Sequence, residues 1–128
     1  MAGEPIRELP GLWVSLDRVE YNPHEKGTPE RPYGFIYHIT IHNDSTRVVT
    51  IKGRKWVVTG ADGSKLVIEG DKVVNQTPRL IPSTQFHYSS YHLVASDSVA
   101  EGAYLGQADD GERVFTRIPP YNMEVPSL

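Results

Sequence analysis

The sequence predicts an all-β protein, a sandwich of two packed sheets built from seven or eight strands. Its β-branched residues number 29, against 16 for alanine, leucine and methionine together, and this balance favours strands over helices. Only residues 35–52 and 83–101 run for more than a dozen positions without glycine or proline. Short strands separated by turn residues every ~8 to 12 positions are typical of a sandwich.

The clearest strand covers residues 33–42, where every second residue from Tyr33 to Ile41 is large and apolar or aromatic. A period of two means that one face of a strand is buried and the other is solvated. The same alternation begins another strand at Phe86. Further strands are expected over residues 12–21, 48–59, 65–68, 103–108 and 113–118, with a last extended piece over 121–125.

Glycine and proline mark the irregular points of these strands. The Asp-Gly pairs at 62–63 and 110–111 supply the positive φ that a tight hairpin needs. The inward face of one strand shifts in parity between Ile51 and Trp56, so we expect a bulge at Gly53. The pair Pro119-Pro120 requires the last strand to be interrupted or to lie at an edge. Residues 93–100 have room for a short helical turn.

One domain accounts for most of the chain. We expect residues 1–10 to be a flexible N-terminus and residues 11–128 to form a single sandwich domain. Large aromatic residues at alternating strand positions are assigned to the core, since a sandwich needs large inward side chains. They are Trp13, Tyr37, Trp56, Phe86 and Tyr88.

Composition excludes several kinds of protein. A net charge of −3 and a pI near 5.9 argue against a nucleic-acid binder, which needs a basic face. Cysteine is absent, which excludes thiol nucleophiles, disulfides and thiolate metal sites. Residues 1–11 do not read as an export signal, and no apolar run approaches the ~20 residues of a membrane span. We expect a cytoplasmic protein that binds neither nucleic acid nor membrane, in an oligomeric state that the sequence leaves open.

We assign no catalytic residue, no cofactor and no metal site. No motif pairs a nucleophile with its base, and Asp109, Asp110 and Glu112 flank a hairpin glycine as in a solvated turn. His38 and His42 share a strand face, but the rise of a strand places them ~13 Å apart, too far for one ion. Hydrolase activity stays a third hypothesis behind two kinds of binding function.

A basic cluster is the main charged feature. Arg47, Lys52, Arg54 and Lys55 lie close together in the sequence, with only Asp44 nearby. We interpret the cluster as a charged strand face or edge that discourages pairing between sheets. The functional alternative is a patch for an anionic partner.

Several sequence blocks resemble the ApaG family. They lie at residues 53–59 (GRKWVVT), 62–63, 67–82, 86–90, 101–104, 110–112, 115–118 and 125–126, and the match spans roughly residues 12–126. The resemblance implies a bacterial-type protein with a fibronectin type III-like, immunoglobulin-like β-sandwich and no established reaction. For the family, a link with cobalt and magnesium handling has been suggested. Related domains in eukaryotic proteins serve as protein-interaction modules, so the resemblance also implies a binding role.

One segment departs from the family pattern. Typical members carry a glycine-rich run that reads like G-x-G-x-x-G, whereas residues 69–75 here read EGDKVVN, with Lys72 and Asn75 in place of two glycines. A phosphate cradle needs free backbone amides and usually a helix N-terminus behind them. This segment follows a strand and leads into a proline-bounded loop, so we do not expect it to bind nucleotides.

We therefore predict a non-catalytic binding module that recognises an unidentified protein through loops or an edge strand. The runner-up is a small-ligand or divalent-cation-responsive protein that uses the loop at residues 69–82. Loops held by a rigid scaffold are frequent recognition sites. A structural alternative is that Val73 and Val74 simply close the end of the core. The candidate partner-binding residues are Arg54, Glu69, Gly70, Gln76, Thr77 and Pro78.

Overall fold

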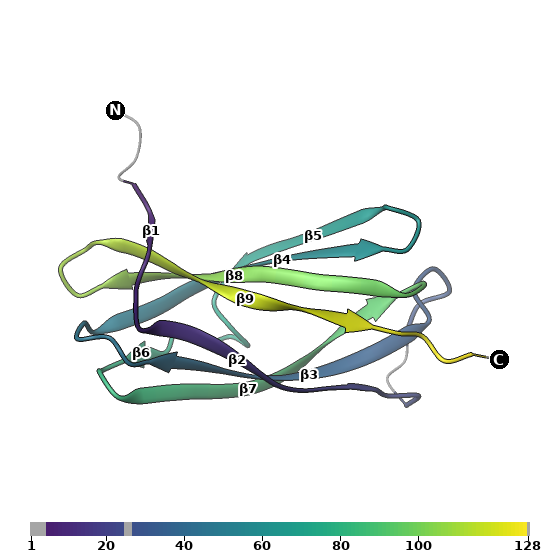
Figure 1. The fold of residues 1–128 in the computed structure, drawn as a ribbon, viewed down its shortest axis with the longest axis horizontal. Coiled ribbons are helices and arrows are strands. Elements are labelled where there is room, and N and C mark those ends of the chain that lie inside the picture. The colour runs from purple at the N-terminus through teal and green to yellow at the C-terminus, as the bar shows by residue number, and fades with distance from the viewer. Residues whose placement is uncertain (1–4, 25–26, 128) are drawn as a thin grey trace.

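The computed structural model describes residues 5–24 and 27–127, and every regular element within them is a β-strand. Figure 1 shows the strands packed as two layers. Their bounds are β1 (Arg7–Glu8), β2 (Leu12–Tyr21), β3 (Tyr33–Asn43), β4 (Val49–Gly60), β5 (Lys65–Asp71), β6 (Arg79–Leu80), β7 (Thr84–Val94), β8 (Ser98–Ala108) and β9 (Arg113–Met123). The predicted all-β sandwich is confirmed, with β1 and β6 as two-residue additions to seven longer strands.

The larger sheet has the strand order β1-β9-β8-β4-β5, with β6 paired to the start of β4, and the smaller sheet has the order β2-β3-β7. Without the two short strands, four strands face three, as in a fibronectin type III-like sandwich. β5 and β7 are edge strands on the same side of the sandwich, where Asp71 and Ser90 line one small hollow. Because β9, β8, β4 and β5 are consecutive in the larger sheet, their outer face is one continuous surface.

The predicted turns and bulge are confirmed. Gly63 and Gly111 have φ values of 85° and 92°, which L-residues with side chains rarely adopt. The register of β4 on β8 shifts between Ile51 and Gly53, so one extra residue of β4 opposes a single step of β8. Ile51 and Trp56 are an odd number of residues apart, and because of the bulge both side chains point into the core. Trp56 is 1% exposed.

Three segments differ from the expected elements. Residues 113–123 form one strand. It tolerates Pro119-Pro120 because its register on β8 shifts at these prolines, and because β1 pairs only with Val114 and Phe115 on the other side of β9. Residues 93–100 hold no helical turn, since β7 continues to Val94 and β8 begins at Ser98. Residues 7–8, within the expected flexible N-terminus, pair with β9, and the adjacent Leu9 is buried. Residues 1–4 lie outside the described residues.

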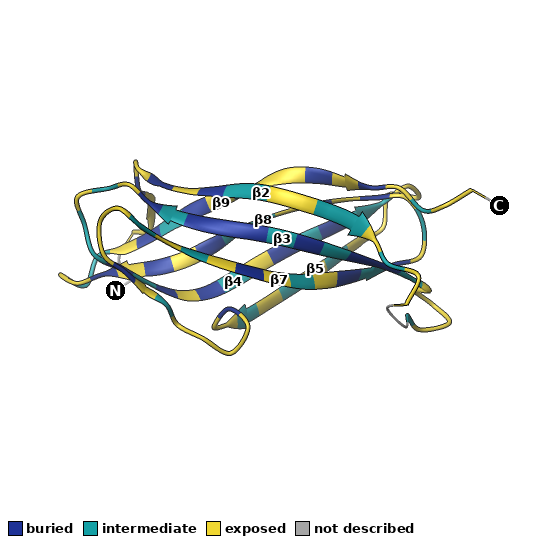
Figure 2. Ribbon diagram, turned by 90° about the horizontal axis from the view of Figure 1, so that it is seen from below, coloured by how far each residue is buried: buried dark blue, intermediate teal, exposed yellow. Residues whose placement is uncertain are grey.

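Buried and exposed residues alternate along the strands, as the bands in Figure 2 show. The prediction that Trp13 belongs to the core was wrong, because Leu12 and Val14 take the inward positions of β2. Trp13 is 45% exposed and stacks on His42, with ring centroids 3.9 Å apart. The other predicted aromatic core residues are Tyr37, Trp56 and Tyr88, which are buried, and Phe86, which is half-buried against them.

The core also contains a buried histidine. His92 is 5% exposed, and its ring centroid lies 4.9 Å from that of Tyr37 and 4.6 Å from that of Trp56. Its Nε2 has no hydrogen-bond partner among the residues that the structure describes. Burial lowers the pKa of His92 to about 4, because the apolar surroundings disfavour the charged imidazolium.

We expect this histidine to make the fold sensitive to acid. Between its ordinary pKa of 6.5 and its folded-state pKa of about 4, the unfolded chain binds the proton and the folded chain does not. The free energy of unfolding should therefore fall by about 3 kcal/mol as the pH drops through this window. Urea unfolding at pH 7, 5.5 and 4 measures the loss, and His92→Phe should remove that part of it. An identical pH dependence in the variant would contradict the prediction.

Candidate functional site

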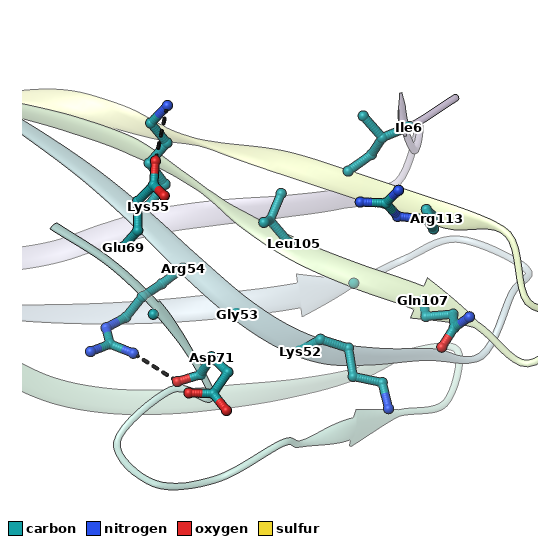
Figure 3. Close-up of a pocket in the computed structure, with 12 residues that line it drawn as sticks. Ile6, Lys52, Gly53, Arg54, Lys55, Glu69, Asp71, Leu105, Gln107 and Arg113 are labelled. Atoms are coloured by element: carbon teal, nitrogen blue, oxygen red, sulfur yellow. Dashed lines mark hydrogen bonds and ion pairs between the residues drawn. The ribbon is translucent and has the colours of Figure 1, made fainter. Parts of the chain in front are cut away.

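A groove crosses the outer face of the larger sheet. It runs over β9, β8, β4 and β5 to the segment before β1, and its volume is about 730 Å³. In Figure 3 the side chains of Lys55, Glu69 and Leu105 project from one side of these strands, whereas the guanidinium of Arg54 lies on the other side, hydrogen-bonded to Asp71. The residues that give the groove its chemistry are Ile6, Lys52, Lys55, Glu69, Leu105 and Arg113.

Cations surround the groove. Lys55 pairs with Glu69 across β4 and β5, with 3.4 Å between Nζ and Oε1 and both side chains largely exposed. Lys52 and Arg113 are exposed and make no ion pair within the described part of the chain. An exposed ion pair contributes at most about 1 kcal/mol, so an incoming carboxylate can compete with Glu69 for Lys55.

The floor of the groove is apolar. Leu105 is 38% exposed, and Ile6 from the segment before β1 is exposed to the same degree. Leu105 points outward because Tyr104 and Gly106 hold the inward positions of β8. An apolar floor surrounded by charge is the composition expected of a recognition surface.

Arg54 points away from the outer face, into the hollow at the sandwich edge that Tyr37 and Ser90 also line. Its Nη1 donates hydrogen bonds to the carbonyl oxygens of Asp71 and Lys72, at 3.0 and 2.8 Å. Gly70 lies directly beneath the guanidinium, since a Cβ built there would be 2.9 Å from Nη1. Glycine at position 70 thus allows Arg54 to hold the end of β5 and the start of the loop.

The loop at residues 72–76 is a tight turn with unusual backbone angles. Val73 and Gln76 exchange both backbone hydrogen bonds at 2.8 Å. Lys72, Val74 and Asn75 have φ values of 67°, 42° and 64°. Positive φ at both central residues of the turn defines type I′, which normally takes asparagine or glycine, and a β-branched valine there is strained. Val73 is fully buried, as the structural alternative expects, but Val74 is 41% exposed.

The structure brings together only part of the predicted partner-binding set. Arg54, Glu69 and Gly70 line the groove. Gln76 and Thr77 are exposed on the loop, and Pro78 uses its carbonyl oxygen to accept a hydrogen bond from the backbone N–H of Ile51. Binding through these six residues stays a prediction, and the groove adds Ile6, Leu105 and Arg113, which sequence reasoning missed. The outward position of Leu105 in an alternating strand was the available signal.

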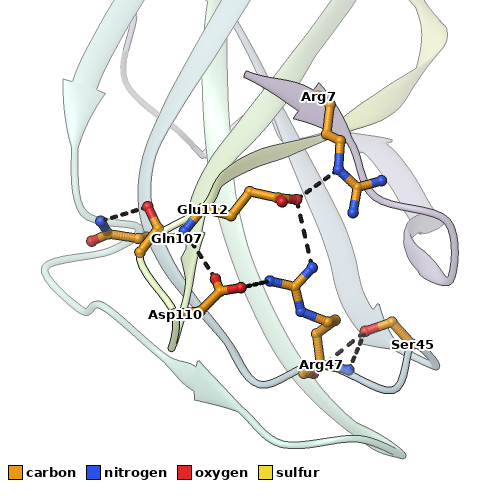
Figure 4. Close-up of polar contacts among 7 residues, drawn as sticks. Arg7, Ser45, Arg47, Gln107, Asp110 and Glu112 are labelled. Carbon is orange, nitrogen blue, oxygen red and sulfur yellow. Dashed lines mark hydrogen bonds and ion pairs between the residues drawn. The ribbon is translucent and has the colours of Figure 1, made fainter. Parts of the chain in front are cut away.

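Arg47 does not belong to the basic cluster in space. Figure 4 shows it between Asp110 and Glu112 in the turn from β8 to β9, with its Nη2 2.7 Å from Asp110 Oδ2. Arg7 Nε lies 2.6 Å from Glu112 Oε1 in the same network. The backbone N–H of Glu112 and the Arg47 guanidinium lower the pKa of Asp110. This turn is therefore a point where ion pairs tie together β1, the loop before β4 and the β8–β9 hairpin.

A second polar cluster lies on the outer face of the smaller sheet. His38 contacts Ser89 through Nδ1 at 2.6 Å and Glu20 through Nε2 at 3.3 Å. His87 lies beside His38, with ring centroids 6.5 Å apart, and its Nδ1 is 3.4 Å from Asp17. A hydrogen bond from Thr40 lowers the pKa of Asp17. Within residues 5–24 and 27–127, no group of three or more His, Asp or Glu side chains is placed to hold a metal ion.

Fold and groove together define a small β-sandwich domain that presents a charged groove on a sheet face. Nothing in the described part of the chain is a helix long and apolar enough to cross a membrane. The sequence profile of the ApaG domain matches residues 23–107, and the chain belongs to the ApaG family.

Known proteins support this assignment. The chain is 36% identical to Protein ApaG of Vibrio cholerae over 106 residues, which cover 81% of this chain and 84% of the relative. It is 33% identical to Protein ApaG of Shewanella frigidimarina over 110 residues, 85% of this chain and 87% of the relative. The X-ray structure of Northeast Structural Genomics Consortium target SoR45 superposes with a TM-score of 0.81 at 28% identity, covering 92% of this chain and 89% of that one.

The backbone of the loop is left-handed at Lys72 and Asn75, the two positions where the family resemblance implies glycine. Glycine adopts that conformation without steric penalty, whereas lysine does not.

We expect Lys72→Gly to stabilise the fold. Removing the side chain relieves the left-handed conformation, and we expect the free energy of unfolding to rise by about 0.5–1 kcal/mol. Lys65→Gly is the matched control, because Lys65 lies within β5 and glycine there should lower stability by a similar amount. Urea unfolding of both variants measures the difference. Destabilisation by Lys72→Gly would show that the lysine side chain, and not backbone strain, dominates at this position.

Proposed function

We propose that the protein is a non-catalytic binding module that recognises a protein partner through the groove on its larger sheet. The observation that carries this proposal is the exposed Leu105 with two cations as diagonal neighbours, Lys52 on β4 and Arg113 on β9, which have no ion pair in the described residues. Charged side chains held around an exposed apolar residue favour association over solvation once a complementary surface is available.

The groove suits recognition because its parts are already in place. Its side chains project from strands that hydrogen bonds hold in register, including β4 on β8 and β8 on β9. A preformed surface loses little conformational freedom on binding, so more of the contact energy appears as affinity. The hydrogen bonds from Arg54 hold the end of β5, at one end of the groove, in the same way.

The polar cluster on the smaller sheet supports binding less well and catalysis poorly. Ser89, His38 and Glu20 are the residue types of a hydrolase triad, but Ser89 is exposed and the Glu20 side chain keeps 37% of its exposure. Electrostatic stabilisation of a transition state depends on donors fixed in a site that excludes water. We therefore assign no reaction to this face.

Partner capture tests the proposed function. Tagged protein is used to capture partners from bacterial lysate, and Leu105→Asp should remove most of any partner that the unchanged protein retains. Val99→Asp is the matched control, because Val99 lies on the same strand outside the groove and is 40% exposed against 38% for Leu105. Both variants should melt within a few degrees of the parent, since exposed substitutions usually change stability by about 0.5 kcal/mol or less.

The proposal fails if capture is equal for the two variants, or if the same proteins bind to an unrelated β-sandwich domain. Thermal melting by circular dichroism shows that any loss of capture is not a loss of folding.

A separate assay addresses catalysis. We expect no hydrolysis of p-nitrophenyl acetate or p-nitrophenyl phosphate above the rate in buffer, and no difference between the parent and Ser89→Ala. The reason is the solvated position of the Ser89–His38 pair. Hydrolysis that disappears in Ser89→Ala would replace the binding module with a hydrolase.

A further inference from the structure

We propose that the groove binds an extended acidic segment of the partner protein, with one apolar side chain of that segment seated on Leu105. This inference rests on the proposed function and names the chemistry of the partner at the same site.

Charge is the first argument. Three cations with outward side chains line the groove, Lys52, Lys55 and Arg113, against two carboxylates, Glu69 and Asp71. The whole chain carries a net charge of −3, so this region is positive on an otherwise acidic protein. A local charge of opposite sign to the rest of the molecule steers a complementary segment to one place and disfavours it elsewhere.

The order of residues across the sheet is the second argument. Arg113 lies on β9, Leu105 on the next strand β8, and Lys52 on the following strand β4. Leu105 itself pairs with Phe115 of β9 and Gly53 of β4, so the two cations are its diagonal neighbours, Arg113 two residues along β9 and Lys52 one residue along β4. The complementary ligand has an apolar residue flanked by acidic ones.

The span of the groove sets the length of the segment. From β5 to β1 there are four steps between neighbouring strands. At ~4.8 Å a step the groove spans ~19 Å, which is the length of about six residues of extended chain at ~3.3 Å each. A short linear segment of a partner therefore fills the groove.

A peptide fits these observations better than a nucleic acid. A nucleic acid carries a charge at every phosphate and cannot avoid Glu69 and Asp71 at one end of the groove, whereas a peptide can place its acidic residues at the cations alone. Leu105 and Ile6 place exposed apolar surface in the groove, which a leucine or phenylalanine side chain covers and a phosphate does not.

Fluorescence polarisation with a defined probe tests the inference. The probe is a fluorescein-labelled peptide with a central leucine flanked by glutamates, compared with one in which glutamine replaces every glutamate and one in which serine replaces the leucine. We expect saturable binding of the first peptide with a dissociation constant below about 1 mM at low salt, and at least about tenfold weaker binding of each of the others. Raising the salt from about 0.05 to about 0.5 M should weaken binding, because screening acts on exposed charges.

Charge-reversal variants locate the site. Lys52→Glu with Arg113→Glu should abolish peptide binding, whereas Arg18→Glu with Lys65→Glu should not. The second pair changes the net charge equally at exposed residues outside the groove, on β2 and β5. The milder pair Lys52→Gln with Arg113→Gln should weaken binding to an intermediate degree, and it serves if the reversal variant does not fold.

Three results would overturn the inference: no saturable binding of the acidic peptide, equal loss in both charge-reversal pairs, or tighter binding of a thymidine oligonucleotide than of the peptide. Failure here is separable from failure of the proposed function. If Leu105→Asp still removes a captured partner while the acidic peptide does not bind, the groove is the partner surface and only its acidic chemistry is wrong. If neither experiment depends on groove residues, both proposals fail.

Discussion

The extra residue that β4 carries between Ile51 and Gly53 determines which of its side chains reach the core and which reach solvent. A shift of one residue in a strand exchanges its two faces. Val49 and Ile51 point inward before the bulge, and Trp56 and Val58 point inward after it. The same bulge leaves Lys52 on the outer face, beside Leu105 of β8. One local irregularity therefore supplies both the largest fully buried side chain of the core and a cation of the groove.

Gly53 and Gly70 extend this dependence to the edge of the sheet. A Cβ at position 53 would be 2.9 Å from the carbonyl oxygen of Gly70, so β4 and β5 approach closely only because glycine occupies the bulge. Gly70 in turn leaves space for the guanidinium of Arg54, whose hydrogen bonds hold the strained turn after β5. The exposed Val74 and the left-handed Lys72 are thus stabilised from outside the turn, because their own conformational preferences oppose it.

Much of the fold could be predicted from the sequence because the patterns that predict the strands and turns are local. Alternation from Tyr33 to Ile41, the glycines of two hairpins and the parity shift at Gly53 each depend on a few neighbouring residues. Trp13 was misplaced because its large aromatic ring outweighed the alternation of Leu12 and Val14, which indicated the inward face. Arg47 was grouped with Lys52 by sequence distance, but its ion pairs are with Asp110 and Glu112, which only the folded chain brings near.

The groove itself was predictable only in part for the same reason. Arg54, Glu69 and Gly70 belong to two paired strands and are close in the sequence, whereas Arg113 and Leu105 enter from strands whose neighbours are fixed by topology. Such a surface differs from a loop in how it binds. In the binding that we propose, the hydrogen-bonded strands have already ordered the backbone of the groove, so the backbone entropy lost on binding belongs mainly to the partner. If the partner segment that we propose is disordered before binding, it gains affinity from few contacts and loses freedom over its whole length, so we expect a reversible association that a change in the charge of the segment weakens.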